Sequence, residues 1–191
     1  MEQVTIIKDT TSNPAPLGLL GFGMTTILLN IHNAGFFGVN SMIIGMGIFM
    51  GGLAQVIAGW QEWKKNNTFG ATAFTAYGMF WLSLVVLWLL PKTAIGATYA
   101  TTEDALGSYL LIWGIFTLFM FIGTLKLSRL LRVIFFTLTI LFFMLAIADF
   151  TDNAQLKIIA GYEGILCGGC AFYGCLAQVL NEVYGKTVMP V

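Results

Sequence analysis

The sequence predicts an all-α integral membrane protein whose six transmembrane helices form one bundle. Of the 191 residues, 58% are hydrophobic and only 9% are charged, whereas a soluble domain uses about 25% charged residues to cover its surface. The apolar residues gather in stretches of about 20, the length that crosses a bilayer as a helix. They do not alternate with polar residues as the strands of an outer-membrane barrel do. An ordinary soluble enzyme, a disordered chain and a basic nucleic-acid or membrane-surface binder are therefore excluded.

Each predicted helix is an apolar stretch between polar or turn-forming connectors. Asn13 can cap the first helix and Pro14 fits its first turn, while Pro91 lies at the end of the third, where its missing N–H costs little. In chain order, the connectors are AGFFGVN, QEWKKNN, PKTAIGATYATTED, KLSR and DFTDNAQLK. The six stretches are Pro16–Asn33, Met42–Trp60, Phe69–Leu90, Leu106–Leu125, Leu130–Ala148 and Ile158–Leu180. Residues 1–191 therefore form one membrane domain, with a polar N-terminal segment at 1–14 and a tail at 181–191.

Basic residues predict the orientation of this domain in the cell membrane, because cytoplasmic segments are rich in Lys and Arg. With the N-terminus inside, the outer loops carry only Lys92 and Lys157. The inner segments carry Lys8, Lys64, Lys65, Lys126, Arg129, Arg132 and Lys186. We therefore expect a multi-pass protein of the plasma or inner membrane with both termini, including segments 1–14 and 181–191, in the cytoplasm.

Glycines recur at helical spacing inside the predicted spans. Gly47, Gly51 and Gly59 lie on one face of the second span, and Gly164 and Gly168 lie on one face of the sixth. Small residues four apart allow transmembrane backbones to approach closely. We expect most of them to serve packing within the bundle, and contact between subunits is the alternative.

Neutral hydrogen-bonding residues inside the spans are the candidate functional residues. The first span carries four of them, and helical spacing places three on the same stripe as Phe22. Such residues either bond helices together or line a polar pathway, and their clustering on one helix favours a pathway. The candidates are Thr25, Thr26, Asn30 and Asn33 on the first span, Gln55 on the second, Thr72 on the third and Gln178 on the sixth.

No catalytic or metal-binding motif is apparent. His32 is the single histidine and has no Glu or Cys at ligand spacing beside it, so we expect an interfacial residue. Cys167 and Cys170 have C-x-x-C spacing, but their apolar surroundings predict small packing residues. Glu163 lies near the outer end of the sixth span, where we expect its side chain to reach water, and a proton site in an outer vestibule is the alternative. The sequence thus predicts no enzyme, no cofactor and no metal site.

Several motifs are similar to those of the acetate uptake transporter family, which includes bacterial succinate–acetate permeases and yeast acetate transporters. The signature N-P-A-P-L-G occupies Asn13–Gly18, with Asn13, Pro14, Pro16 and Gly18 as its marked positions. The likeness continues in chain order through GFGMTTILLN, GGLAQ at Gly51–Gln55, NTFG-TAFTAYG-FW at Asn67–Trp81, FTLFMF-GTLK at Phe116–Lys126, FFTLTILFFMLAI at Phe135–Ile147 and LNE at Leu180–Glu182. Glu163 and the loop after Pro91 depart from the pattern.

The resemblance implies a six-helix protomer, commonly assembled as a homohexamer, with a substrate pathway through each protomer. By motif, Phe22, Tyr77 and Leu138 look like the hydrophobic constriction of that pathway. The implied function is that of a transporter or channel for acetate and, as further candidates, succinate and other small carboxylates. Proton symport and passive anion conduction stay open. The alternatives are a channel for ammonia or another small neutral solute, and a membrane scaffold that transports nothing.

Overall fold

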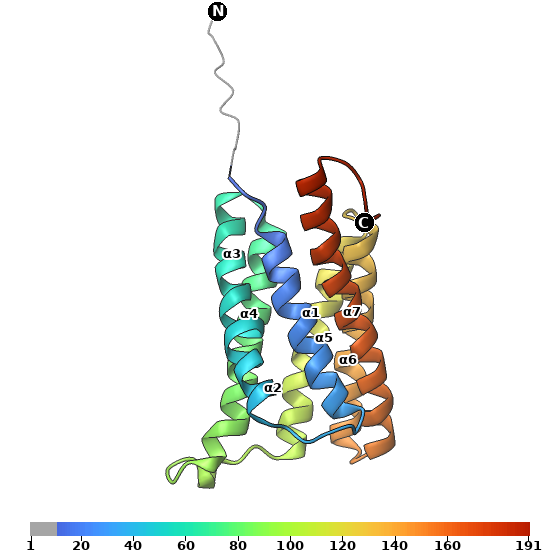
Figure 1. The fold of residues 1–191 in the computed structure, drawn as a ribbon. Helices are drawn as coiled ribbons and strands as arrows, with labels where there is room; N and C mark the ends of the chain where they lie inside the picture. The colour runs from blue at the N-terminus through green and yellow to red at the C-terminus, as the bar shows by residue number, and fades with distance from the viewer. Residues whose placement is uncertain (1–10) are drawn as a thin grey trace, which may run out of the picture.

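The computed structural model describes residues 11–191 as a bundle of six helical spans (Figure 1). The spans are α1 (Ala15–Asn33), the run of α2 (Ser41–Met46), η1 (Gly47–Ala54) and α3 (Gln55–Lys64), α4 (Thr68–Leu89), α5 (Glu103–Thr124), α6 (Arg129–Phe150) and α7 (Ala154–Tyr184). Each span is long and apolar enough to cross a membrane, and the described residues include no strand. The predicted all-α class and its six spans are confirmed.

Both ends of the described chain lie at one end of the bundle, which we call the near end, and the loops α1–α2, α4–α5 and α6–α7 lie at the opposite, far end (Figure 1). The α4–α5 loop holds two short 3-10 turns, η2 (Leu90–Lys92) and η3 (Ala97–Tyr99). The side of the membrane that each end faces stays a prediction from the basic residues.

Polar side chains in the connectors cap the N-termini of the helices. At five starts a side-chain oxygen accepts a hydrogen bond from a backbone N–H of the first turn, which would otherwise have no partner. The five caps are Asn40, Asn67, Thr102, Ser128 and Asn153. Helix α1 begins differently from the prediction, with Pro14 at the cap position and the Asn13 side chain accepting from the N–H of Ala15 at 3.1 Å.

The last helix is longer than its apolar stretch. It continues to Tyr184, so the first four residues of the predicted tail at 181–191 are helical. Hydropathy marks only the part of a helix that lipid surrounds, whereas Asn153 at the start and the left-handed Gly185 at the end define the helix itself. The first ten residues of the predicted segment 1–14 lie outside the described residues.

Close backbone contact holds α1 against α7. A Cβ on Gly23 would lie 2.6 Å from the backbone N of Phe172, and a Cβ on Gly168 would lie 2.9 Å from the carbonyl oxygen of Gly23. Gly161 faces the backbone of Ala34 in the same way. These glycines therefore pack helices within one chain, as expected for most of the glycines in the spans.

Aromatic side chains close the bundle between α4 and α5. The Phe80 and Tyr109 rings stack with centroids 5.6 Å apart, and the Phe80 and Trp113 rings meet edge to face at 5.2 Å. Tyr77 meets Phe116 at 5.7 Å, also edge to face. Large rings fill the space here because these two helices make no close backbone contact of the α1–α7 kind.

The second span contains a π-helical segment that the sequence did not reveal. Over η1 the backbone is wound more widely than an α-helix, and the Gln55 amide donates to the carbonyl oxygen of Gly51 at 2.7 Å. The side chain of Thr25 donates to the carbonyl oxygen of Met46 at 3.3 Å. A side chain of α1 thus bonds the carbonyl just before the segment, and a side chain of the following turn bonds a carbonyl in its middle. Short π-helical segments are frequent at functional sites.

Two expectations about α7 have different outcomes. Cys167 is buried and its thiol donates to the carbonyl oxygen of Ile134 at 3.7 Å, as expected for a packing residue. Glu163 does not reach water as expected, because both its carboxylate oxygens are buried, and they have no partner among the described residues. The sequence placed Glu163 near the outer end of the sixth span, but that position does not show which side of the helix neighbouring helices cover.

Adjacent glycines on α7 provide a test of the backbone contact. Gly168→Ala forces a methyl group against Gly23 and Ile27, whereas a Cβ on Gly169 meets nothing within 4 Å. Overpacking of this kind costs about 1–3 kcal/mol, so we expect a lower Tm for the detergent-solubilised Gly168→Ala variant and an unchanged or higher Tm for Gly169→Ala. Equal values for the two variants would contradict the contact.

Candidate functional site

Two cavities lie inside the bundle, one toward its near end and one toward its far end. The near cavity, about 270 Å³, includes Ala15, Asn67 and Gln178 in its wall, and the far cavity, about 110 Å³, includes Asn33, Trp88 and Lys157. Both walls are mostly apolar, with polar groups at a few positions. Concave sites of this kind, apolar with a few placed polar groups, are typical of small-molecule binding.

Three residues line both cavities, and they are the three that the family motif singled out. Phe22 comes from α1, Tyr77 from α4 and Leu138 from α6. All three are buried, and the rings of Phe22 and Tyr77 lie with centroids 6.1 Å apart. Because the near and far cavities share only these residues, Phe22, Tyr77 and Leu138 lie between them.

The hydroxyl of Tyr77 is bonded to α5. Its oxygen lies 2.9 Å from the Thr117 hydroxyl oxygen, and Thr117 donates its own proton to the carbonyl oxygen of Trp113 at 2.7 Å. Since a threonine hydroxyl has one proton, Tyr77 is the donor in their bond. The ring of Tyr77 therefore lines the cavities while its hydroxyl proton is bonded to Thr117. The sequence did not indicate that Thr117 holds Tyr77 in place.

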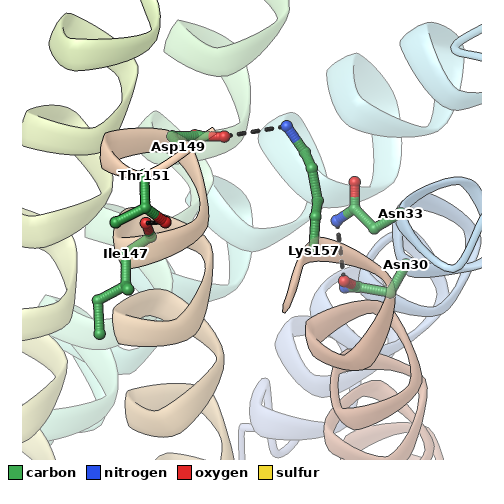
Figure 2. Close-up of polar contacts among 6 residues, drawn as sticks. All are labelled: Asn30, Asn33, Ile147, Asp149, Thr151 and Lys157. Atoms are coloured by element: carbon green, nitrogen blue, oxygen red, sulfur yellow. Dashed lines mark hydrogen bonds and ion pairs between the residues drawn. The ribbon is translucent and has the colours of Figure 1, made fainter. Parts of the chain in front are cut away.

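Polar groups of α1 form a row along the far cavity. The amide of Asn33 donates to the side-chain oxygen of Asn30 at 3.0 Å (Figure 2). The amide of Asn30 donates in turn to the carbonyl oxygen of Thr26 at 2.9 Å. The hydroxyl of Thr26 is buried and has no partner among the described residues. All three residues line the cavity as the predicted pathway requires.

An ion pair lies at the far end of the same cavity. The ammonium of Lys157, in the first turn of α7, donates to the carboxylate of Asp149, near the end of α6, at 3.0 Å (Figure 2). Both residues line the far cavity. The sequence placed them outside the membrane and gave them no role, because helical spacing cannot show that two connector residues eight positions apart meet over a cavity. His32 lies here too, with Nδ1 donating to the carbonyl oxygen of Phe37 at 2.7 Å.

The near cavity holds two predicted residues and an acidic group that was not predicted. Gln55 and Gln178 line it, and Gln178 accepts from the amide of Asn13 at 3.2 Å. The carboxylate of Glu62 accepts from the amide of Asn67 at 2.7 Å, and Glu62 is buried although it lies in a connector that reads as polar. The signature residue Asn13 thus links the start of α1 to the lining of this cavity.

Two of the predicted pathway residues line neither cavity. Thr25 is buried against the π-helical segment, where it bonds Met46, and Thr72 lies on the exposed side of α4. The signature residues Pro14, Pro16 and Gly18 shape the start of α1, where Pro16 is in the first turn and a Cβ on Gly18 would collide with the ring of Phe74. Thr25 and Thr72 therefore contribute to the wall of neither cavity.

Residues 11–191 contain no group of three or more His, Cys, Asp or Glu side chains that could hold a metal ion. The polar groups on the two cavities are mainly neutral amides and hydroxyls, with charge confined to Glu62 at the near end and to Asp149 and Lys157 at the far end. Such linings suit weak, reversible contact with a small polar solute.

A six-span bundle with cavities lined from both ends defines a multi-pass membrane protein of the transporter and channel class. The chain belongs to the GPR1/FUN34/yaaH family, whose profile matches residues 2–191. It is 56% identical over 180 residues to the succinate-acetate/proton symporter SatP of Escherichia coli, covering 94% of this chain and 95% of that protein. It is 37% identical over 177 residues to the Saccharomyces cerevisiae ammonia transport outward protein 2, covering 90% of this chain and 62% of that protein.

A solved structure has the same fold. The structure of the bacterial acetate channel SatP matches with a TM-score of 0.93 and 54% sequence identity, covering 95% of this chain and 99% of the other.

The Tyr77–Thr117 bond predicts a pattern of stabilities. Thr117→Val removes the acceptor and leaves the buried Tyr77 hydroxyl unpaired, which costs about 1–3 kcal/mol. We expect Tyr77→Phe in the Thr117→Val background to restore much of the loss, because the pair then becomes apolar. Thermal unfolding of the wild type, both single variants and the double variant measures the coupling, and simple additivity would contradict it.

Proposed function

We propose that this protein conducts acetate across the cell membrane through a passage within each protomer, with Phe22, Tyr77 and Leu138 as its constriction. One observation carries the proposal: these three residues are shared by the two cavities and come from three different helices. The passage runs from the near cavity, past Gln178 and Gln55, to the far cavity. There it continues past Thr26, Asn30 and Asn33.

The lining suits a small carboxylate for a physical reason. Transferring a bare carboxylate into hydrocarbon costs far more than one contact can offset. Neutral amide and hydroxyl donors replace part of its hydration shell without holding it as a buried arginine would. The apolar constriction accepts the methyl group and excludes larger or more strongly hydrated ions.

The known relatives support the same substrate class. One of them is named a succinate-acetate/proton symporter and the matching structure is titled an acetate channel. We therefore include succinate as a candidate substrate and leave proton coupling to experiment. A homohexamer stays a prediction of the family resemblance.

Ammonia is the second candidate, because a yeast relative is named an ammonia transport protein. That relative is 37% identical, against 56% for the succinate-acetate symporter. Competition of labelled-acetate uptake by succinate, with ammonium as the comparison, separates the two candidates.

Flux through purified protein tests the proposal. We expect labelled acetate to enter proteoliposomes faster than it enters protein-free liposomes when the pH gradient and the membrane voltage are set independently. Flux that follows voltage and ignores the pH gradient identifies anion conduction, whereas flux that requires the pH gradient identifies symport. No acetate flux above the protein-free control would contradict transport and support the scaffold alternative.

The constriction predicts a change in selectivity. Phe22→Ala removes a buried ring between the cavities, so we expect faster flux of larger carboxylates such as butyrate relative to acetate. The matched control is Phe119→Ala, because Phe119 is 69% exposed on α5 and lines neither cavity. Unchanged selectivity in a folded Phe22→Ala variant would remove Phe22 from the constriction.

A further inference from the structure

We propose that the Lys157–Asp149 pair is a carboxylate-docking site at the far mouth of the passage, in which Lys157 binds the substrate carboxylate and Asp149 weakens that binding. The inference rests on the proposed function, since it names the group that first meets the anion. It concerns the two charged residues on the far cavity, which the neutral pathway does not use.

The two side chains differ in their access to water. The side chain of Asp149 is 5% exposed and that of Lys157 is 42% exposed. The carboxylate is thus fixed in the wall, while the ammonium lies between the wall and the solvent. An ammonium has three N–H donors, and among the described residues only the bond to Asp149 uses one of them. The remaining donors are available to an entering carboxylate.

The pair continues the row of donors on α1. In the view of Figure 2 the side chain of Lys157 lies between Asp149 and the two asparagines Asn30 and Asn33, and all four residues line the far cavity. Each asparagine uses one amide proton within the row and keeps a second. Thr26 follows one helical turn closer to Phe22, and its hydroxyl has no partner among the described residues. A carboxylate moving inward would therefore meet a full charge, then amides, then a hydroxyl.

The charge of Asp149 adjusts the strength of this site. An isolated ammonium beside an apolar wall attracts an anion strongly, because the effective dielectric constant there is lower than in water. A carboxylate at 3.0 Å offsets most of that attraction. The anion is then drawn to the mouth but is not trapped, as conduction requires.

A purely structural role for the pair makes a different prediction. If the ion pair only fastened α6 to α7, removing either partner would have the same effect on transport. For docking, the two substitutions have opposite effects, since Lys157→Gln removes the attracting charge and Asp149→Asn removes the opposing one. The sign of the change therefore separates the two roles.

Equilibrium exchange of labelled acetate measures the effect in proteoliposomes that contain equal acetate on both sides, so the orientation of the protein does not matter. We expect Lys157→Gln to raise the half-saturating acetate concentration about fivefold and Asp149→Asn to lower it about threefold. Lys157→Arg keeps the charge and should stay within about twofold of the wild type. The matched control is Lys92→Gln, an exposed far-end lysine that lines neither cavity, and it should leave exchange unchanged.

Ionic strength gives a second measurement that does not depend on the stability of Asp149→Asn. Between about 0.02 and 0.5 M NaCl, screening should slow wild-type exchange at low acetate several-fold and should leave Lys157→Gln almost unaffected. Equal salt dependence in the two proteins, or shifts of the same sign in Lys157→Gln and Asp149→Asn, would overturn the docking site. A wild type that exchanges acetate no faster than protein-free liposomes would overturn the proposed function itself.

Discussion

The contact between the backbones of α1 and α7 determines where the two cavities can lie. Gly23 and Gly168 allow the two helices to approach until only hydrogen atoms separate their main chains. Helix α1 carries Phe22 and the row from Thr26 to Asn33, so its position sets the position of most of the polar lining. On the opposite side, α4 and α5 are held apart by aromatic rings. Close packing on one side and wide packing on the other leave the cavities between them.

The bilayer explains how the polar residues divide into two groups. In hydrocarbon, an unpaired polar group is costly, so hydroxyls away from the cavities bond the backbone of their own helix. Thr117, Thr137 and Thr139 all do this with carbonyls three or four residues earlier. In contrast, the hydroxyl of Thr26 and the side-chain oxygen of Gln55 are buried on the cavities without a partner among the described residues. The free hydroxyl of Thr26 and the free side-chain oxygen of Gln55 thus lie where a solute in the proposed passage could bond them.

The sequence could predict what depends on local pattern. Apolar length predicted the six spans, and the polar stripe on α1 predicted Thr26, Asn30 and Asn33 on one cavity. Thr25 and Thr72 show the limit of this reasoning, because a neutral residue in a span gives no sign of which neighbour it faces. Leu138 was found only through the family motif, since a leucine in an apolar helix has no distinguishing chemistry. The π-helical segment and the Tyr77–Thr117 bond depend on packing between helices that no local pattern describes.

The charged residues that line a cavity at the helix ends were the hardest to predict from the sequence, because their position there also depends on packing between helices. Hydropathy places charged residues outside the spans and thereby treats them as surface, although the side chain of Asp149 is only 5% exposed. The ends of a bundle are where a passage opens, so a connector residue can be both at the membrane boundary and in the wall of a cavity. A passage with neutral groups inside and an opposed pair of charges at one mouth can attract an anion from water and still release it into the interior. If the proposed passage conducts an anion, the scarcity of charge in the sequence and its placement in the structure meet the same physical requirement.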